Sequence, residues 1–334
     1  MEATGDRPDF SVIVPVAPGR APLVLESLRK IDPLGASCEV LTQAGPNPSR
    51  NRNQRVHVAC ADVLAFTDDD CRVAPDWLAR AAAFFREHPD YDAVGGPQLN
   101  GGDEGAIGRA SGHALASWFG TYRQCRRYRR ASLDLAATQS DLTSANLFVT
   151  RRAFEAWGPF DERLWPNEET ALLRRIERAG GKIAYDPEIV VFHKRRPSLR
   201  ALARQCFGYG RGRARQSTIE GTRVPGISQL VPCLFLVYLA VLPFLGSMTA
   251  LALVPLAIYA AVAIAVSART AVAESDAPAA ALMPVAFSVI HVAYPAGFVF
   301  ESLRIAIVDP SLTSLSDESP VPRPMAARDA RIPR

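Results

Sequence analysis

The strongest constraint on this chain of 334 residues is a long apolar segment in its C-terminal half. Residues 224–268 contain no Asp, Glu, Lys or Arg, whereas residues 1–223 are rich in charged side chains. Core helices of soluble proteins rarely run so far without a charge, and about 20 apolar residues suffice to cross a bilayer. The sequence therefore predicts a globular domain over 1–223 and a membrane module over 224–308.

The membrane module is predicted to contain two or three helices. Two spans are expected, over residues 228–246 and 248–267. A third apolar stretch, 279–300, contains His291 and two prolines, so it is expected to span, to lie in the interface or to pack against the other two. Residues 309–334 are rich in Pro, Ser and Arg, a composition typical of disorder.

The charge pattern predicts where the globular domain lies. Eight arginines stand between residues 195 and 223, and a basic cluster beside a span is typical of the cytoplasmic face, where it meets anionic membrane lipids. A solvated helix face is the simpler alternative. Because residues 1–9 lack the features of a secretory signal, we expect a multi-pass protein of the inner membrane with a cytoplasmic globular domain. The net charge of +4 is too small to indicate nucleic-acid binding.

The globular half alternates apolar runs with helical patterns. Residues 10–16 and 63–66 are continuous apolar runs, which are typical of buried parallel strands. Helices are expected over the following ranges: 21–31, 51–61, 75–88, 168–179 and 199–215. The stretch 100–140 is less regular, with several glycines and then a basic run over 123–130. This alternation predicts an α/β fold in which helices flank a mainly parallel sheet.

Three consecutive acids, Asp68, Asp69 and Asp70, follow the strand at 63–66 directly. Adjacent carboxylates repel one another, so a fold tolerates them best beside a cation or in solvent. Ligands of open α/β sheets bind beyond the carboxyl ends of the strands, and Mg²⁺ or Mn²⁺ prefers carboxylate oxygens. An isolated Asp triplet is more often a surface turn, but the apolar strand before it favours a metal site.

Residues 64–78, Leu-Ala-Phe-Thr-Asp-Asp-Asp-Cys-Arg-Val-Ala-Pro-Asp-Trp-Leu, resemble the donor-site motif of family 2 glycosyltransferases. Further matches follow in the family's order: 10–16 with Pro15, Arg52-Asn53, 94–96, 144–162 and 167–188. The resemblance extends over residues 8–215 and implies the GT-A fold. It also implies an inverting, metal-dependent transfer of one sugar from a nucleotide-sugar donor.

The resemblance assigns roles to individual residues. Asp68 and Asp70 are expected to bind the divalent metal, Mg²⁺ or Mn²⁺, and His193 stands where related enzymes often carry a histidine near the donor diphosphate. His193 is therefore a candidate metal or phosphate contact, although a strand-end histidine facing solvent is an equal alternative. The residues expected to contact the donor are Pro15, Asn53, Asp68, Asp69, Arg211 and Arg213.

Glu169 occupies the position of the family's catalytic Asp, so it is the candidate general base, with Glu168 as the alternative. Acidic residues in the first turn of a helix are also favoured by the helix dipole alone.

Two departures from the family pattern limit what the resemblance implies. The Arg and Trp of the processive motif are missing after Gln205, which favours single-sugar addition, and the loop 41–49 lacks the acid that helps to read the nucleobase.

The sequence therefore favours a membrane-anchored glycosyltransferase acting on a lipid-linked or saccharide acceptor. The pattern at 209–213, the apolar helices and His291-x-x-Tyr294 together resemble the succinoglycan-biosynthesis branch of the family. A polyprenyl-phosphate glycosyltransferase is the nearest alternative. A catalytically inactive membrane scaffold is the alternative from another class. A nucleotidyltransferase is disfavoured, because no Gly-rich, Lys-containing phosphate loop accompanies the first strand.

Overall fold

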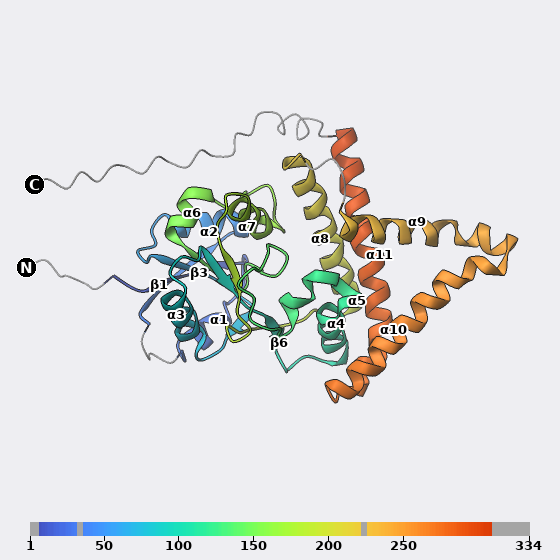
Figure 1. Ribbon diagram of the computed structural model, residues 1–334, viewed down its shortest axis with the longest axis horizontal. Helices are drawn as coiled ribbons and strands as arrows, with labels where there is room; N and C mark the ends of the chain where they lie inside the picture. The colour runs from blue at the N-terminus through green and yellow to red at the C-terminus, as the bar shows by residue number, and fades with distance from the viewer. Residues whose placement is uncertain (1–6, 32–35, 222–225, 309–334) are drawn as a thin grey trace, which may run out of the picture.

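The computed structural model describes residues 7–31, 36–221 and 226–308. The predicted disorder of 309–334 lies outside these residues. Figure 1 shows an α/β domain on one side and a group of long helices on the other, with α8 (Leu199–Ile219) and α11 (Ala277–Val308) at the junction between them.

The main sheet has six strands in the order β2-β1-β3-β7-β5-β8. These are β1 (Phe10–Val16), β2 (Cys38–Ala44), β3 (Val63–Phe66), β5 (Ala93–Gly95), β7 (Leu147–Thr150) and β8 (Ile183–Tyr185). Among the described strands of this sheet, β7 alone runs antiparallel to its neighbours. The prediction of a mainly parallel sheet is therefore confirmed.

A second sheet of three short strands lies beside the carboxyl end of β3. It consists of β4 (Cys71–Val73), β9 (Val191–His193) and β6 (Gln98–Asn100), with β9 in the middle. Cys71 pairs directly with His193 across the antiparallel β4–β9 ladder. This register places the Asp triplet, which immediately precedes β4, next to a histidine far away in the sequence.

Helices flank the sheet as predicted, with shifted ends. They are α1 (Val24–Leu28), α2 (Pro48–Val56), α3 (Trp77–Glu87), α6 (Arg151–Trp157) and α7 (Glu168–Arg178). The stretch 100–140, which has a less regular sequence pattern, contains three helices for which no bounds were expected: α4 (Ala106–Ala116), α5 (Trp118–Thr121) and η1 (Tyr122–Tyr128). The buried face of α4 consists largely of small residues that pack against α11. Because small residues are only weakly hydrophobic, the sequence of α4 shows no clear helical periodicity.

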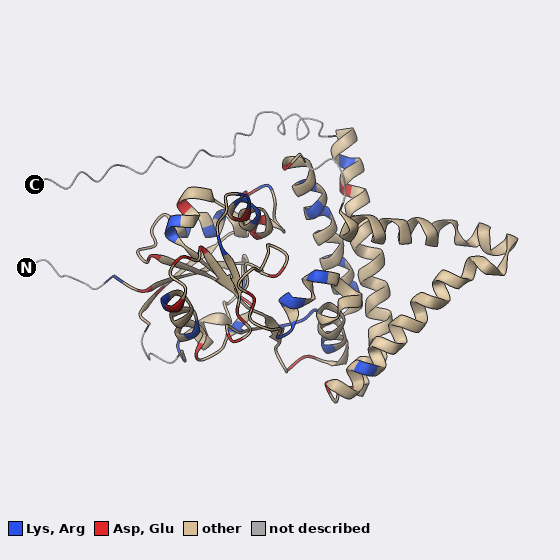
Figure 2. Ribbon diagram, in the orientation of Figure 1, with Lys and Arg blue, Asp and Glu red and all other residues tan. Residues whose placement is uncertain are grey.

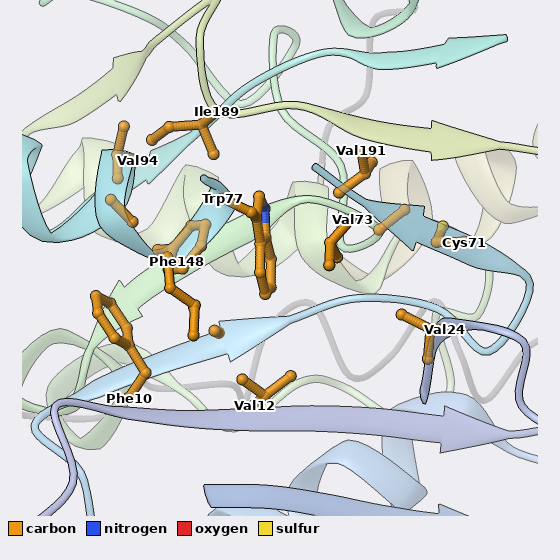
Figure 3. Close-up of a cluster of buried hydrophobic side chains, with 14 of the residues drawn as sticks. Phe10, Val12, Val24, Cys71, Val73, Trp77, Val94, Phe148, Ile189 and Val191 are labelled. Atoms are coloured by element: carbon orange, nitrogen blue, oxygen red, sulfur yellow. The ribbon is translucent and has the colours of Figure 1, made fainter. Parts of the chain in front are cut away.

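A buried aromatic cluster holds α3 against the sheet (Figure 3). The ring centroids of Trp77 and Phe148 lie 4.7 Å apart. Trp77 also donates its indole N–H to Oδ1 of Asn146 at 2.8 Å, while Nδ2 of Asn146 donates to the carbonyl of Ile189 at 2.7 Å and to that of Pro97 at 3.1 Å. The fully buried Asn146 therefore joins α3 to the loops before β6 and β9.

Replacing Asn146 with Leu is expected to destabilise the protein by at least about 2 kcal/mol. The apolar side chain has a similar size, but it leaves the indole N–H of Trp77 and the carbonyl of Ile189 without a partner, and each such group costs about 1–3 kcal/mol. The carbonyl of Pro97 keeps its hydrogen bond from the backbone N–H of Val191 at 3.2 Å. Denaturant unfolding followed by tryptophan fluorescence measures the change. An unchanged midpoint would contradict the structural role given to this amide.

Within residues 226–308, the described part of the C-terminal half, three helices are long and apolar enough to cross a membrane. They are α9 (Ile227–Met248), the 24-residue segment formed by η2 (Ala250–Leu253) and α10 (Val254–Ala273), and α11. In Figure 1, α9 and α10 project from α11 as a V, and Figure 2 shows that α9 carries no charged residue. The third apolar stretch belongs to α11, which packs along α8 and α4.

Candidate active site

A cavity of about 790 Å³ lies beyond the carboxyl ends of β1 and β3 and extends to α8 and α11. Among the described residues, its wall includes every predicted site residue except Asn53: Pro15, Asp68, Asp69, Asp70, Glu168, Glu169, His193, Arg211 and Arg213. Tyr294 of α11 lines the same cavity. One cavity therefore joins the end of the sheet to a helix that is long and apolar enough to span a membrane.

Asp69 holds the loop that follows β1. Its Oδ2 accepts a hydrogen bond from the backbone N–H of Ala17 at 2.8 Å, and its Oδ1 pairs with Nη1 of Arg20 at the same distance. The residue is only 5% exposed. This carboxylate therefore shapes the cavity wall, and its expected contact with the donor stays a prediction.

Asp70 and His193 form the more open part of the acidic cluster. Oδ1 of Asp70 lies 3.1 Å from Nε2 of His193, and its Oδ2 lies 3.1 Å from Nη1 of Arg20. Burial opposes ionisation, but these two partners and Arg196 outweigh it and hold the pKa of Asp70 below its usual value. The other ring nitrogen of His193, Nδ1, is buried without a hydrogen-bond partner among the described residues.

The donor set at this point fits a divalent cation. Asp70, Cys71 and His193 place one ligand atom each within 4.8 Å of one another. Burial raises the pKa of the Cys71 thiol well above its usual value, which favours the protonated thiol. The carboxylate of Asp70 and the imidazole of His193 are the ligands that Mg²⁺ or Mn²⁺ would prefer here. Asp68, whose side chain is 30% exposed, adds a second carboxylate to the wall of the cavity. Carboxylate oxygens suit Mg²⁺ and Mn²⁺.

Arg52 connects the carboxylate of Asp68 with that of Glu168. The sequence did not predict this role. Nη2 of Arg52 donates to Oδ1 of Asp68 and its Nη1 to Oε1 of Glu168, both at 2.6 Å. The side chain is 2% exposed, and the two carboxylates offset the cost of burying its charge. Asn53, by contrast, exchanges two hydrogen bonds with the backbone of Phe160, at 2.9 and 3.0 Å, away from the cavity.

The two glutamates at the start of α7 differ in how tightly they are held. Glu168 is bound by Arg52 and by the backbone N–H of Asn167, and burial raises its pKa to about 7 against the opposing charge of Arg52. Glu169 has longer contacts, 3.4 Å to Nη1 of Arg127 and 3.5 Å to the hydroxyl of Thr170. The carboxylate of Glu169 is therefore the less tightly held of the two.

The arginines of α8 are held by nearby side chains. Nε of Arg211 donates to Glu301 of α11 at 2.7 Å, and Arg213 is buried and donates to Oε1 of Gln216 at 2.8 Å. Both arginines line the cavity, so their expected contacts with phosphate stay predictions.

A comparison of the sequence with models of protein families identifies the family of this chain. Residues 3–212 match the model described as glycosyltransferase like family 2. The chain belongs to this family. The expected family is thereby confirmed, and so is the expected fold class: a GT-A-type α/β domain followed by apolar helices that could span a membrane.

Two relatives extend this family assignment. The succinoglycan biosynthesis protein ExoA of Rhizobium meliloti is 34% identical over 156 residues, which are 45% of each chain. The pre-mycofactocin glycosyltransferase of Mycobacterium tuberculosis is 29% identical over 224 residues, covering 60% of this chain and 46% of the relative. The chain thus matches less than half the length of either relative.

Solved structures give only a distant likeness. A mannosyltransferase from Pyrobaculum calidifontis, solved in complex with GDP-Man and Mn²⁺, superposes with a TM-score of 0.49 at 16% identity. The superposition covers 86% of this chain and 87% of that one. A likeness at this level carries no argument about the site.

Proposed function

We propose that this protein is an inverting, metal-dependent glycosyltransferase of the inner membrane. It moves one sugar from a nucleotide-sugar donor to a lipid-linked or saccharide acceptor at the cytoplasmic face. The observation that carries the proposal is a single cavity lined by the metal-binding set around Asp70, by Glu169 and by Tyr294 of α11. Donor, base and membrane-held acceptor then meet in one place.

At the donor end, Asp68, Asp70 and His193 would hold Mg²⁺ or Mn²⁺. The bound ion offsets the negative charge of the donor diphosphate and of the departing nucleotide. Arg52 orients Asp68 by its 2.6 Å ion pair, and Asp69 fixes the loop beside Pro15 that forms the neighbouring wall.

At the acceptor end, Glu169 would take the proton from the attacking hydroxyl while Arg127 and Thr170 orient its carboxylate. The hydroxyl then displaces the nucleotide in one step from the opposite face of the sugar, which inverts the anomeric centre. Arg211, Arg213 and Tyr294 line the wall next to α8 and α11, which favours an acceptor held by the membrane. The name of the Rhizobium relative favours a polysaccharide product.

A polyprenyl-phosphate glycosyltransferase is the second candidate. The arginines that line the cavity beside α11 favour it, because guanidinium groups bind phosphate well. A phosphate acceptor is already ionised and needs no strong base. Loss of Glu169 would then have little effect on the rate, which separates this candidate from the first.

The proposed function predicts nucleotide release that requires both a divalent metal and an acceptor. We expect membranes containing the protein to release nucleotide from one member of a nucleotide-sugar panel, and chelation with EDTA to abolish the release. Membranes without the protein are the control. Calorimetry with the same donors, in the presence of Mn²⁺ or Mg²⁺, separates the alternatives, since complete absence of donor binding would favour the inactive scaffold.

A further inference from the structure

Helix α8 lies between the globular domain and α11 (Figure 1), and its contact with α11 runs backbone to backbone. A Cβ atom at Gly210 would lie 2.0 Å from the carbonyl oxygen of Tyr294 and 2.7 Å from the backbone nitrogen of Phe298. From the other helix, a Cβ at Gly297 would lie 2.0 Å from the carbonyl oxygen of Phe207. Only glycine permits so close an approach from both sides.

Gly212 makes an equally close contact with the segment that precedes the catalytic glutamates. A Cβ there would lie 2.1 Å from the carbonyl oxygen of Pro166 and 2.8 Å from Nδ2 of Asn167. Asn167 directly precedes α7 and has a φ of 114°, a conformation that costs free energy for a residue other than glycine. Its side-chain amide also lies 3.5 Å from the carbonyl oxygen of Tyr209 on α8. The turn that begins α7 therefore rests on the backbone of α8.

Ion pairs hold the same three helices together. Arg174 of α7 pairs with Glu220 at the C-terminal end of α8. Arg211 and Arg215 of α8 pair with the fully buried Glu301 of α11 at 2.7 and 2.6 Å. These ion pairs connect α7 to the end of α8, and α8 to α11.

We infer that Gly210, Gly212 and Gly297 are positioning residues, which transmit the placement of α11 through α8 to the carboxylates of Glu168 and Glu169. The catalytic meaning of this link rests on the proposed function. If the carboxylate of Glu169 is fixed relative to α11, its distance from the membrane surface stays constant. The hydroxyl of an acceptor that is held in the membrane also stays at a constant distance from that surface. Reactions between two positioned groups are sensitive to displacements of about 1 Å.

Hydrogen exchange tests the link without any use of activity. In the full chain in lipid nanodiscs, Gly297→Ala is expected to increase amide exchange in residues 167–171, although the substitution lies on α11. Helix propensity alone favours alanine, so loosening would come from the clash with Phe207. Gly246→Ala on α9 is the matched control, because its Cβ would meet nothing within 4 Å. Unchanged exchange at residues 167–171 in folded Gly297→Ala protein would overturn the inference.

Gly212→Ala tests the same link from the other face of α8 and serves if Gly297→Ala does not fold. We expect kcat to fall about 10- to 100-fold and donor affinity to fall by much less, because the displaced turn carries Glu169 itself. Glu168, on the same turn, reaches the metal ligand Asp68 only through Arg52. A kcat within about twofold of wild type, or a matching loss of donor binding, would overturn the inference. Absence of transfer by the wild-type protein would instead refute the proposed function, and the exchange measurement would still decide whether the helices are linked.

Discussion

Asp70→Asn is expected to reduce sugar transfer by about 10²–10³-fold, the loss seen when one preorganised charge-stabilising group is removed from an active site. The substitution keeps the size of the side chain and removes the charge that faces both His193 and the cavity. It should also weaken donor binding in the presence of Mn²⁺. Initial rates measured over a range of Mn²⁺ concentrations, together with calorimetry of donor binding, test both effects.

Asp76→Asn is the matched control for this substitution. Asp76 lies in the same stretch of sequence, but its carboxylate pairs with Arg80 at 2.8 Å, and its side chain is 47% exposed. The control is expected to transfer sugar within about twofold of wild type, because an exposed ion pair contributes at most about 1 kcal/mol to stability. Equal activity of Asp70→Asn and Asp76→Asn, with unchanged metal dependence, would refute the metal site.

The position of the Asp triplet could be predicted from the sequence because an apolar strand immediately precedes it. Its pairing with His193 follows from the β4–β9 ladder, in which each strand has only three residues. Runs of that length carry no usable periodicity, since the same residues suit a loop equally well. The sequence therefore indicated both residues as candidates through the family resemblance, and the ladder explains why they meet.

Arg52 and Arg127 were harder to predict. Each is a buried arginine whose carboxylate partner lies elsewhere in the sequence, and a charged residue in a helical or irregular pattern normally suggests exposure. Arg127 also lies in η1, within the stretch whose sequence pattern is less regular. Its guanidinium binds the carbonyls of Gln139 and Ser140 and the carboxylate of Glu169. The element that carries it, η1, packs against α4, which itself packs against the distant α11, so the local sequence does not show these contacts.

The family resemblance included the pair Arg52-Asn53 but did not show which of the two side chains lies at the site. Consecutive residues of a helix point in different directions, so one member of the pair enters the cavity and the other faces away from it. Arg52 reaches the carboxylates, while Asn53 fixes the backbone at Phe160. Only the tertiary structure shows which of the two faces the site.

Glu169→Gln is expected to reduce transfer to a hydroxyl acceptor by about 10²–10⁴-fold, the usual contribution of a general base. The amide has the same shape but cannot take the proton. Donor KM and metal dependence should change little, because Glu169 contacts Arg127 and Thr170 and not the metal ligands. Steady-state rates with each substrate varied in turn separate kcat from the donor KM.

Glu168→Gln is the informative comparison, because it breaks the ion pair with Arg52, which also holds Asp68. We expect that variant to lose donor affinity together with rate. If Glu168 were the base instead, the wild-type rate would rise with pH through about 7, because burial raises the pKa of Glu168 to about that value, and Glu168→Gln would remove this rise. For Glu169→Gln, a rate within about tenfold of wild type would exclude Glu169 as the base. If Glu169→Gln also transferred sugar efficiently to a polyprenyl phosphate, the second candidate function would be favoured, because the phosphate oxygen of that acceptor needs no deprotonation.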